Sequence, residues 1–170
     1  AFKNNKQNGQ GTYTYADGSI YVGDFMDDVK TGQGTKTWGP KTALAGDKYV
    51  GAFKNNKQNG QGTYTYADGS IYVGNFDNNI KVGKGTLTWG PETDLAGHKY
   101  TGDFEDNKQS GQGTYTYADG STYVGGFQNN MKMGHGVKAW PDGNQYTGAF
   151  KDNLRTGQGT YSYANGDSYV

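Results

Sequence analysis

The 170-residue chain holds 30 Gly, 15 Tyr, 7 Phe and 3 Trp, while only 32% of its residues are hydrophobic, so a thick aliphatic core is excluded and rings must supply most of the buried surface. Sixteen basic and sixteen acidic residues cancel, so the net charge gives no reason to expect nucleic-acid binding. The absence of net charge and the high aromatic content also argue against a disordered chain. Cys is absent, so disulfides and thiolate metal sites are excluded.

A motif Tyr-x-Gly-x-Phe recurs in register along the chain. Successive motifs are 23 or 28 residues apart, and a larger period of 51 residues covers two of them. The two longer intervals contain the same five-residue insertion, within 39–48 and 90–99. The spacing predicts a single array over residues 1–170, with about seven repeats. The motif tyrosines are Tyr21, Tyr49, Tyr72, Tyr100, Tyr123 and Tyr146.

Each repeat reads as two strands. After Tyr-x-Gly-x-Phe come a polar turn, the segment Gly-x-Gly-Thr-x-Thr-aromatic, and Ala-Asp-Gly. Residues alternate with a period of two, and no apolar stripe of helical period accompanies the many Gly, Thr and Tyr residues. Asn, Asp and Gly clusters fall at hairpin intervals. The pattern predicts an all-β fold: an elongated, single-layered antiparallel meander of about 14 strands.

Turn chemistry predicts one strand register. Residues directly opposite each other in a sheet project to the same face. A three-residue loop over 67–69, with Gly69 in a left-handed bulge conformation, would pair Tyr64 with Tyr72 and Gly62 with Gly74. This register brings the aromatic residues of the motif to one face.

The other turn predicts the same separation of faces. A four-residue loop over 78–81 would set Phe76 opposite Gly83, and Gly74 opposite Gly85. One face then carries a furrow of glycines bordered by rings, because a residue without a side chain leaves room for neighbouring rings. The opposite face carries threonines and other polar residues, and we expect it to be solvated.

These residues resemble the membrane occupation and recognition nexus (MORN) repeat. The matching elements are Tyr-x-Gly-x-Phe, Asn-Gly-Gln-Gly-Thr-Tyr and the Asp-Gly turn at a spacing of 23 residues, over essentially the whole chain. The resemblance implies an all-β meander used for protein interaction, assembly or membrane lipid contact, with enzymatic activity confined to attached domains. The two insertions depart from this pattern, as do Lys36 and Lys138, which replace the strand tyrosine found at Tyr64.

The sequence offers no constellation of catalytic or ligating residues. The two histidines, His98 and His135, are isolated, and we interpret both as solvated. The Gly-x-Gly pairs lack the spacing of a phosphate loop. Asp27 and Asp28 loosely suggest a calcium loop but lack its terminal Glu, so we interpret them as turn formers. The prediction is a non-enzymatic chain with no cofactor and no metal.

Three tryptophans recur every 51 residues at the ends of alternate second strands: Trp38, Trp89 and Trp140. Core packing on the aromatic face is one interpretation, and ring platforms for a partner peptide or a sugar are the other. Leu44 and Leu95 lie beside two of them in the insertions and favour a rim that faces a partner. These five residues are the candidate partner contacts.

Basic residues recur at the polar turns, which we expect along one sheet edge at a spacing of about 10 Å. Such a row suits contact with anionic lipid headgroups. Aspartates at the same turns largely cancel the charge. The alternative is therefore that these basic residues are surface charges that keep the protein soluble. The candidate lipid contacts are Lys6, Lys57 and Lys108 at one turn position, and Lys30, Lys81, Lys132 and Arg155 at the next.

The leading hypothesis is a non-enzymatic scaffold for protein–protein interaction or assembly. The alternatives are a peripheral membrane adaptor that binds anionic phospholipids, and a cell-surface or carbohydrate-binding module. Strands cut at Ala1-Phe2 and at Tyr169-Val170 also predict self-association through terminal strand edges. No apolar run approaches the roughly 20 residues of a membrane helix, and no signal peptide is visible. The sequence therefore leaves both localisation and partner identity open.

Overall fold

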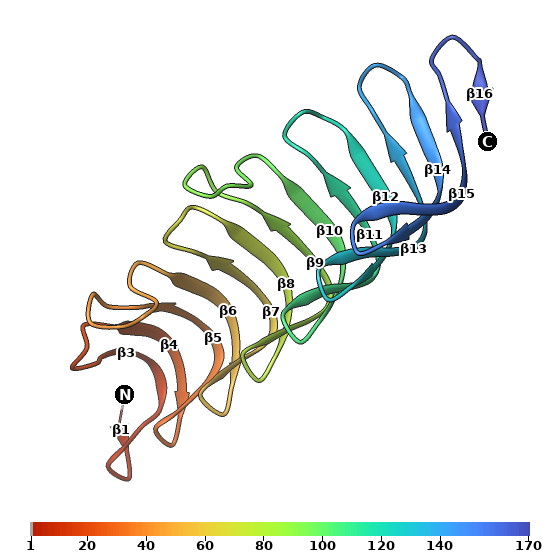
Figure 1. Ribbon diagram of the computed structural model, residues 1–170. Coiled ribbons are helices and arrows are strands. Elements are labelled where there is room, and N and C mark those ends of the chain that lie inside the picture. Colours follow the sequence, from red (N-terminus) through yellow and green to blue (C-terminus); the bar gives the residue numbers. More distant parts are fainter. Residues whose placement is uncertain (1) are drawn as a thin grey trace.

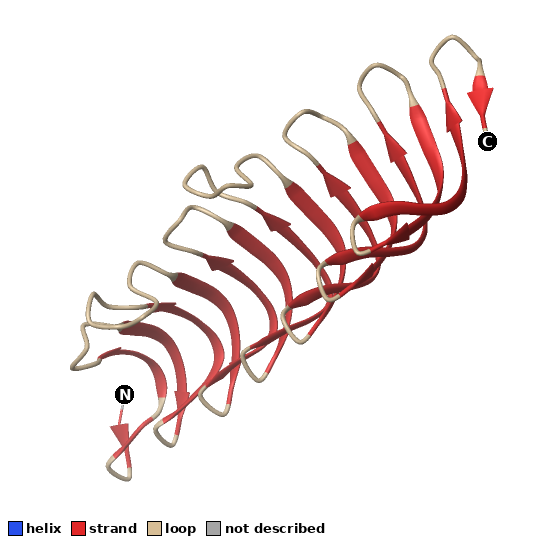
Figure 2. Ribbon diagram, in the orientation of Figure 1, coloured by secondary structure: helices blue, strands red, loops and turns tan. Residues whose placement is uncertain are grey.

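The computed structural model describes residues 2–170, which form antiparallel strands joined by short turns (Figure 2). No helix occurs in this part of the chain, and none therefore has the length and apolar character needed to cross a membrane. The repeat start expected at Ala1 lies outside the described residues, as does the side chain of Phe2.

Fourteen strands form one sheet in which each strand pairs with its neighbours in sequence, from β3 to β16 (Figure 1). This topology confirms the predicted all-β meander. The strands of this sheet are β3 (Gly9–Thr14), β4 (Ile20–Met26), β5 (Val29–Thr37), β6 (Lys48–Lys54), β7 (Lys57–Thr65), β8 (Ile71–Asp77), β9 (Ile80–Thr88), β10 (Lys99–Glu105), β11 (Lys108–Thr116), β12 (Thr122–Gln128), β13 (Met131–Ala139), β14 (Gln145–Lys151), β15 (Leu154–Ser162) and β16 (Ser168–Tyr169). A separate pair is formed by β1 (Phe2–Lys3) and β2 (Lys6–Gln7).

The sheet is strongly curved. Figure 1 shows each hairpin bent into an arc, and the stacked arcs enclose a trough that runs along the array. The Asp-Gly turns lie along one rim of this trough and the Asn-Asn turns along the other (Figure 1). A single layer of strands thus has an inner face that it partly wraps around.

The loop over 67–69 has the predicted register. Tyr64 pairs with Tyr72 and Gly62 with Gly74. The amide of Gly69 donates to the carbonyl of Tyr66 at 3.1 Å, and Gly69 has a φ of 81°, in the left-handed region that glycine tolerates. The three-residue loop is confirmed.

The other turn differs from the prediction. Phe76 lies opposite Lys81, not Gly83, because the turn contains only Asn78 and Asn79. Their φ values of 50° and 72° suit a two-residue hairpin turn whose twist matches that of the strands. The register then shifts at Gly74, so that Gly74 still pairs with Gly85 as predicted. The extra residues of β9 are absorbed in a bulge, which also bends the strand.

The core is one continuous chain of edge-to-face rings on the inner face. Tyr72, fully buried, contacts Phe76 of its own strand and Phe104 of the next hairpin, with ring centroids 5.2 and 4.9 Å apart. Eleven such contacts, at 4.7–5.5 Å, join twelve rings without a break. Each pair stabilises by about 0.5–1.5 kcal/mol beyond its buried area. In order along the array the rings are Phe25, Tyr21, Phe53, Tyr49, Phe76, Tyr72, Phe104, Tyr100, Phe127, Tyr123, Phe150 and Tyr146.

Each motif tyrosine lies flat over two glycines. The hydroxyl of Tyr72 donates to the carbonyl of Asn75 in its own strand, at 3.1 Å. The ring therefore crosses Gly74 and its partner Gly85. A Cβ on Gly74 would lie 2.6 Å from Cζ of Tyr72 and 2.8 Å from Cα of Gly85, closer than real Cβ atoms approach. This confirms the predicted glycine furrow.

The second residue of each two-residue Asn/Asp turn clamps neighbouring hairpins together. The amide of Asn79 donates to the carbonyl of Gln58 at 3.0 Å, and the amide of Gln58 donates to Oδ1 of Asn79 at 2.8 Å. The clamp satisfies both backbone groups of Gln58 at the rim of the trough. Equivalent clamps are made by Asp28, Asn56, Asn107, Asn130 and Asn153.

The furrow predicts that Gly74→Val unfolds or distorts the array, because the new side chain would occupy the space of the Tyr72 ring. We expect a loss of about 3 kcal/mol in the free energy of unfolding, at the upper end of the usual cost of overpacking a core. Thr65→Val, on the threonine face, is the matched control and should change stability by less than about 0.5 kcal/mol. Equal shifts in thermal melts of the two variants would contradict this assignment of faces.

The clamp predicts a cost for Asn79→Gly, which keeps the positive φ of the turn but removes the oxygen that accepts from Gln58. We expect a loss of about 1–2 kcal/mol in urea unfolding, the cost of leaving one backbone amide unsatisfied. Asn78→Gly removes only an exposed bond to Asp77 and serves as the control. Equal stabilities of the two variants would show that the clamp contributes nothing.

Candidate functional site

Two equivalent pockets open into the trough, and we name them pocket A and pocket B. Pocket A, of about 360 Å³, lies over β6 and β7, and pocket B, of about 340 Å³, lies over β10 and β11. The shared lining residues are 51 positions apart, so the two-repeat period seen in the sequence gives two copies of one site. Trp38, Leu44, Phe53, Gln58 and Tyr64 line pocket A, and Trp89, Leu95, Phe104, Gln109 and Tyr115 line pocket B.

The five-residue insertions build one wall of each pocket. The amide of Gly39 donates to Oγ of Ser19 at 3.0 Å, which ties the start of the insertion to the preceding turn. Leu44 in this loop is 44% exposed and faces the pocket. Trp38 is half-buried and packs on Tyr64, with ring centroids 5.3 Å apart. Trp38 therefore fits both the core-packing and the partner-contact interpretation, because one part of its ring packs in the core and another lines the pocket.

Trp140 differs from its two equivalents because no insertion follows it. Its ring packs on Tyr161 at 5.5 Å and lies under the side chains of Lys138 and Arg155. It lines neither pocket A nor pocket B. The structure therefore brings together four of the five candidate partner contacts, as two Trp–Leu pairs, and separates Trp140 from them.

A polar latch holds the end of each insertion, and sequence analysis missed it. Asp47 accepts from the hydroxyl of Tyr64 at 2.5 Å and from the amide of Ala67 at 2.8 Å. His98, at the equivalent position, is half-buried and bonds through Nδ1 to the hydroxyl of Tyr115 at 2.8 Å. The interpretation of His98 as solvated is therefore wrong, whereas His135 is exposed. The signal was a hydrogen-bonding residue two positions before the motif tyrosine.

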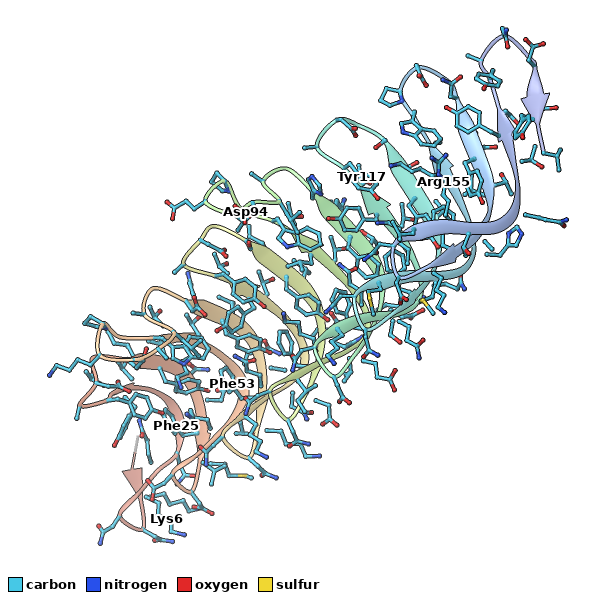
Figure 3. The ribbon with its side chains drawn as sticks, viewed as in Figure 1. Lys6, Phe25, Phe53, Asp94, Tyr117 and Arg155 are labelled. Carbon is cyan, nitrogen blue, oxygen red and sulfur yellow. The ribbon has the colours of Figure 1, made fainter. Side chains whose placement is uncertain are left out.

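The second set of basic residues points into the trough. Lys81 places its ammonium over the rings of Tyr66 and Tyr72, at 5.0 and 5.2 Å from their centroids. The expectation of a single basic row along the turn edge is wrong, because the two-residue turn sets Lys81 opposite Phe76 on the inner face. Lys30, Lys132 and Arg155 also lie over rings of the inner face. In Figure 3, Arg155 is labelled toward the C-terminal end of the array, and Phe25 and Phe53 toward the N-terminal end.

The first set of basic residues stays at the turn rim, as expected. Lys6, Lys57 and Lys108 are exposed. Lys108 donates to the side chain of Asn129 at 3.3 Å, beside the turn.

The cations of the trough have no carboxylate partner among residues 2–170. Lys36 and Lys138 also stack on rings of the inner face. The one ion pair in the described part of the chain joins Lys84 and Asp103 on the opposite face. Among the described residues, two carboxylates border the inner face. Asp47 is buried and its oxygens are occupied by the latch, and Asp28, which lines the same hollow as Lys30, accepts from the amide of Gln7 in its clamp. A chain with no net charge therefore has a positive trough.

Burial lowers the pKa of these ammonium groups, because the charged form loses hydration. The pKa of Lys132 falls to about 8, chiefly through burial and secondly through repulsion by Lys138. Burial likewise lowers the pKa of Lys30 and of Lys81. Stacking on aromatic faces compensates part of this cost. A carboxylate brought into the trough would stabilise these charges further.

Comparison with known proteins identifies the repeat. The family pattern described as MORN repeat matches seven segments: residues 1–20, 21–42, 49–71, 72–92, 100–122, 123–145 and 146–168. The chain belongs to the MORN repeat family. Comparison of this MORN array with curated protein sequences finds no match.

Solved structures with a similar fold include a TCP domain. The MORN array is similar to the TCP domain of SAS-4 (dCPAP) of Drosophila melanogaster, solved in complex with a proline-rich motif of Ana2 (dSTIL). That match has 15% identity and a TM-score of 0.50, and it covers 94% of this chain and 87% of that one. The TCP10 domain of Danio rerio CPAP, as the E1021V mutant, shows 12% identity, a TM-score of 0.40 and coverage of 94% and 80%. At these identities the likeness concerns the fold alone.

The opposite face of the MORN array also has a hollow, of about 520 Å³. Thr86, Thr101, Val73 and Val124 line it, together with Lys84, which is paired with Asp103. No aromatic ring lines this hollow. The described residues contain no group of three His, Cys, Asp or Glu side chains suited to a metal ion. The trough is therefore the stronger candidate for a binding site.

The surroundings of Lys132 predict a titration that the sequence alone would not suggest. Its side chain should titrate near pH 8 in an NMR experiment on Nζ or Cε. Lys138→Gln should raise this midpoint, because removal of a neighbouring positive charge favours the protonated form. A midpoint near 10.5 in the unmodified protein would contradict the described position of Lys132 over the rings.

Proposed function

We propose that this MORN array is a non-enzymatic scaffold that binds a segment of another protein in its aromatic trough. The observation that carries the proposal is the repetition of pocket A as pocket B on one open face. Each pocket combines a tryptophan, an exposed leucine and the amide of a glutamine. Aromatic and aliphatic side chains with a few polar groups are typical of sites that anchor peptide side chains.

The fold neighbour supports the same class of function. The TCP domain of SAS-4 was solved with a proline-rich motif of Ana2, so an open sheet of this general shape carries a peptide in that protein. We propose a peptide-like occupant for the MORN array as well, on the strength of its own pockets.

Lipid and sugar remain the competing occupants. A membrane adaptor needs cations that reach a flat surface, but Lys30, Lys81 and Lys132 fold back over rings inside the trough. A sugar platform needs open ring faces, but Trp38 and Trp89 each have a tyrosine neighbour at 5.3–5.4 Å. Both observations favour a protein segment.

Selection from a displayed library of random peptides tests the proposal. We expect enriched peptides to bind the intact chain with micromolar affinity. The double variant Trp38→Ala with Trp89→Ala should weaken this binding by about tenfold or more, since anchors in pockets dominate such interfaces. The control is Val73→Lys with Val124→Lys, two exposed positions on the opposite face, and it should bind as the parent does. Thermal melts verify that all variants are folded.

The proposal fails if no peptide is enriched, or if the opposite-face control abolishes binding while the tryptophan variant does not. Co-sedimentation with vesicles rich in phosphatidylserine near 0.15 M salt, lost on substitution of the exposed rim residues Lys6, Lys57 and Lys108 by Glu, would establish the lipid function in its place. Salt-insensitive binding of glucans would establish the carbohydrate function.

Self-association through terminal strands stays a prediction. In the described sheet β3 and β16 are the two edge strands. Exposed edges recruit further strands. Light scattering that rises with concentration up to millimolar protein would support it, and a constant monomer mass would contradict it.

A further inference from the structure

Cations and pockets alternate along the axis of the trough. The ammonium of Lys30 lies over Tyr15 and Tyr21, before pocket A. That of Lys81 lies over Tyr66 and Tyr72, between pocket A and pocket B. The ammonium of Lys132 follows pocket B, over Tyr115, Tyr117 and Tyr123. From β5 to β13 the inner face therefore presents five sites in one line: cation, pocket, cation, pocket, cation. Lys30 itself borders a further hollow, of about 510 Å³, and Arg155 on β15 adds a cation beyond Lys132.

The spacing of this line is set by the strands. Neighbouring strands lie about 4.8 Å apart, so one hairpin advances the array by about 9.6 Å. From one cation to the next is four strands, from β5 to β9 and from β9 to β13, or about 19 Å. A pocket lies midway, so consecutive sites are separated by about 9–10 Å.

A polyproline II helix has the matching repeat. It has three residues per turn and a rise of about 3.1 Å per residue, so one turn advances about 9.3 Å. Residues i, i+3 and i+6 project from the same side of such a helix. A β-strand does not fit, because residues three apart project to opposite faces. A segment in polyproline II conformation lying along the trough would meet one site with every third side chain.

The charge of the sites fixes the chemistry of these side chains. Lys30, Lys81 and Lys132 have no carboxylate partner among residues 2–170. The pockets between them are lined mainly by aromatic and aliphatic side chains, with asparagines of the turns at the rim and, in pocket A, Lys36 over the ring of Trp38. Gln58 and Gln109 also line them, and their side-chain amides have no hydrogen-bond partner in the described part of the chain. Amide donors suit the exposed backbone carbonyls of a polyproline II segment, which makes no internal hydrogen bonds.

We propose that the trough recognises an acidic polyproline II segment of a partner protein, in which every third residue is alternately a carboxylate and a bulky apolar residue. The carboxylates bind Lys30, Lys81 and Lys132, and the apolar side chains enter pocket A and pocket B. The inference rests on the proposed function and adds to it the charge, the conformation and the residue spacing of the ligand.

A synthetic 13-residue peptide tests the proposal directly. It carries Glu at positions 1, 7 and 13, Leu at positions 4 and 10, and mostly Pro elsewhere. Fluorescence anisotropy with the whole chain should show binding that weakens about threefold or more between 0.05 and 0.3 M salt, since exposed charges are screened. One control peptide places the second Leu at position 8 and keeps the composition. The other replaces each Glu by Gln. Each should bind at least about fivefold more weakly.

Variants of the protein supply the second arm of the test. Lys81→Met keeps an unbranched side chain over the rings but removes the charge, and it should weaken the Glu peptide about fivefold and leave the Gln peptide unchanged. Lys99→Met is the matched control, because Lys99 is exposed on the opposite face of β10. It should leave both affinities unchanged.

The outcomes separate this inference from the proposed function. Equal binding of the Glu, Gln and shifted-Leu peptides would overturn the inference. So would no detectable binding of the Glu peptide alongside display-selected peptides that need Trp38 and Trp89, and that second result would leave the proposed function intact. If the display selection also yields nothing, both proposals fail. Tight binding of any polyanion, polyglutamate included, would show charge attraction without spacing and would also overturn it.

Discussion

The fold depends on the contact between one tyrosine ring and two glycines. Tyr72 lies along its own strand because its hydroxyl bonds to the carbonyl of Asn75, and this position is open only because Gly74 and Gly85 have no Cβ. A sheet of one layer normally leaves both faces to water, yet five of the six motif tyrosines are fully buried and Tyr146 is nearly so. The ring is covered by the phenylalanines of two hairpins and by backbone. The sheet thus forms a core without a second layer.

The same contact shapes the binding face. A ring that lies against the backbone needs a strand that bends around it, and the register shift at Gly74 supplies the bend. Stacked bends make the trough, with pocket A and pocket B where the insertions raise one wall. The two-residue turn that precedes the bulge also determines where the basic residues lie, because it places Lys81 among the rings. Burial of the core and formation of a positive groove therefore have one structural cause.

The array is stabilised between neighbours. Each clamp, such as that of Asn79 with Gln58, joins one hairpin to the next. Each phenylalanine of the ring chain after Phe25 bridges two tyrosines, as Phe76 bridges Tyr49 and Tyr72. Stability in such arrays is a sum of nearest-neighbour terms. A ligand that crosses several hairpins would therefore add contacts between units that otherwise touch only their neighbours, which suits a scaffold.

The sequence by itself determined the repeat, the all-β class, the glycine furrow and the loop over 67–69. These are periodic and local features. A glycine indicates a left-handed turn at position 69 and a close approach of a ring to the backbone at position 74. The number of residues in the Asn-Asn turn was decided by the tertiary structure. The count of residues between Phe76 and Gly83 cannot distinguish a longer loop from a short turn followed by a bulge. The inward direction of Lys81 follows from that choice. The bond between His98 and Tyr115 joins residues 17 apart, from the end of the insertion to β11, so the folded sheet was needed to show it. Periodic signals identify faces, whereas bulges and contacts between hairpins depend on how the sheet curves.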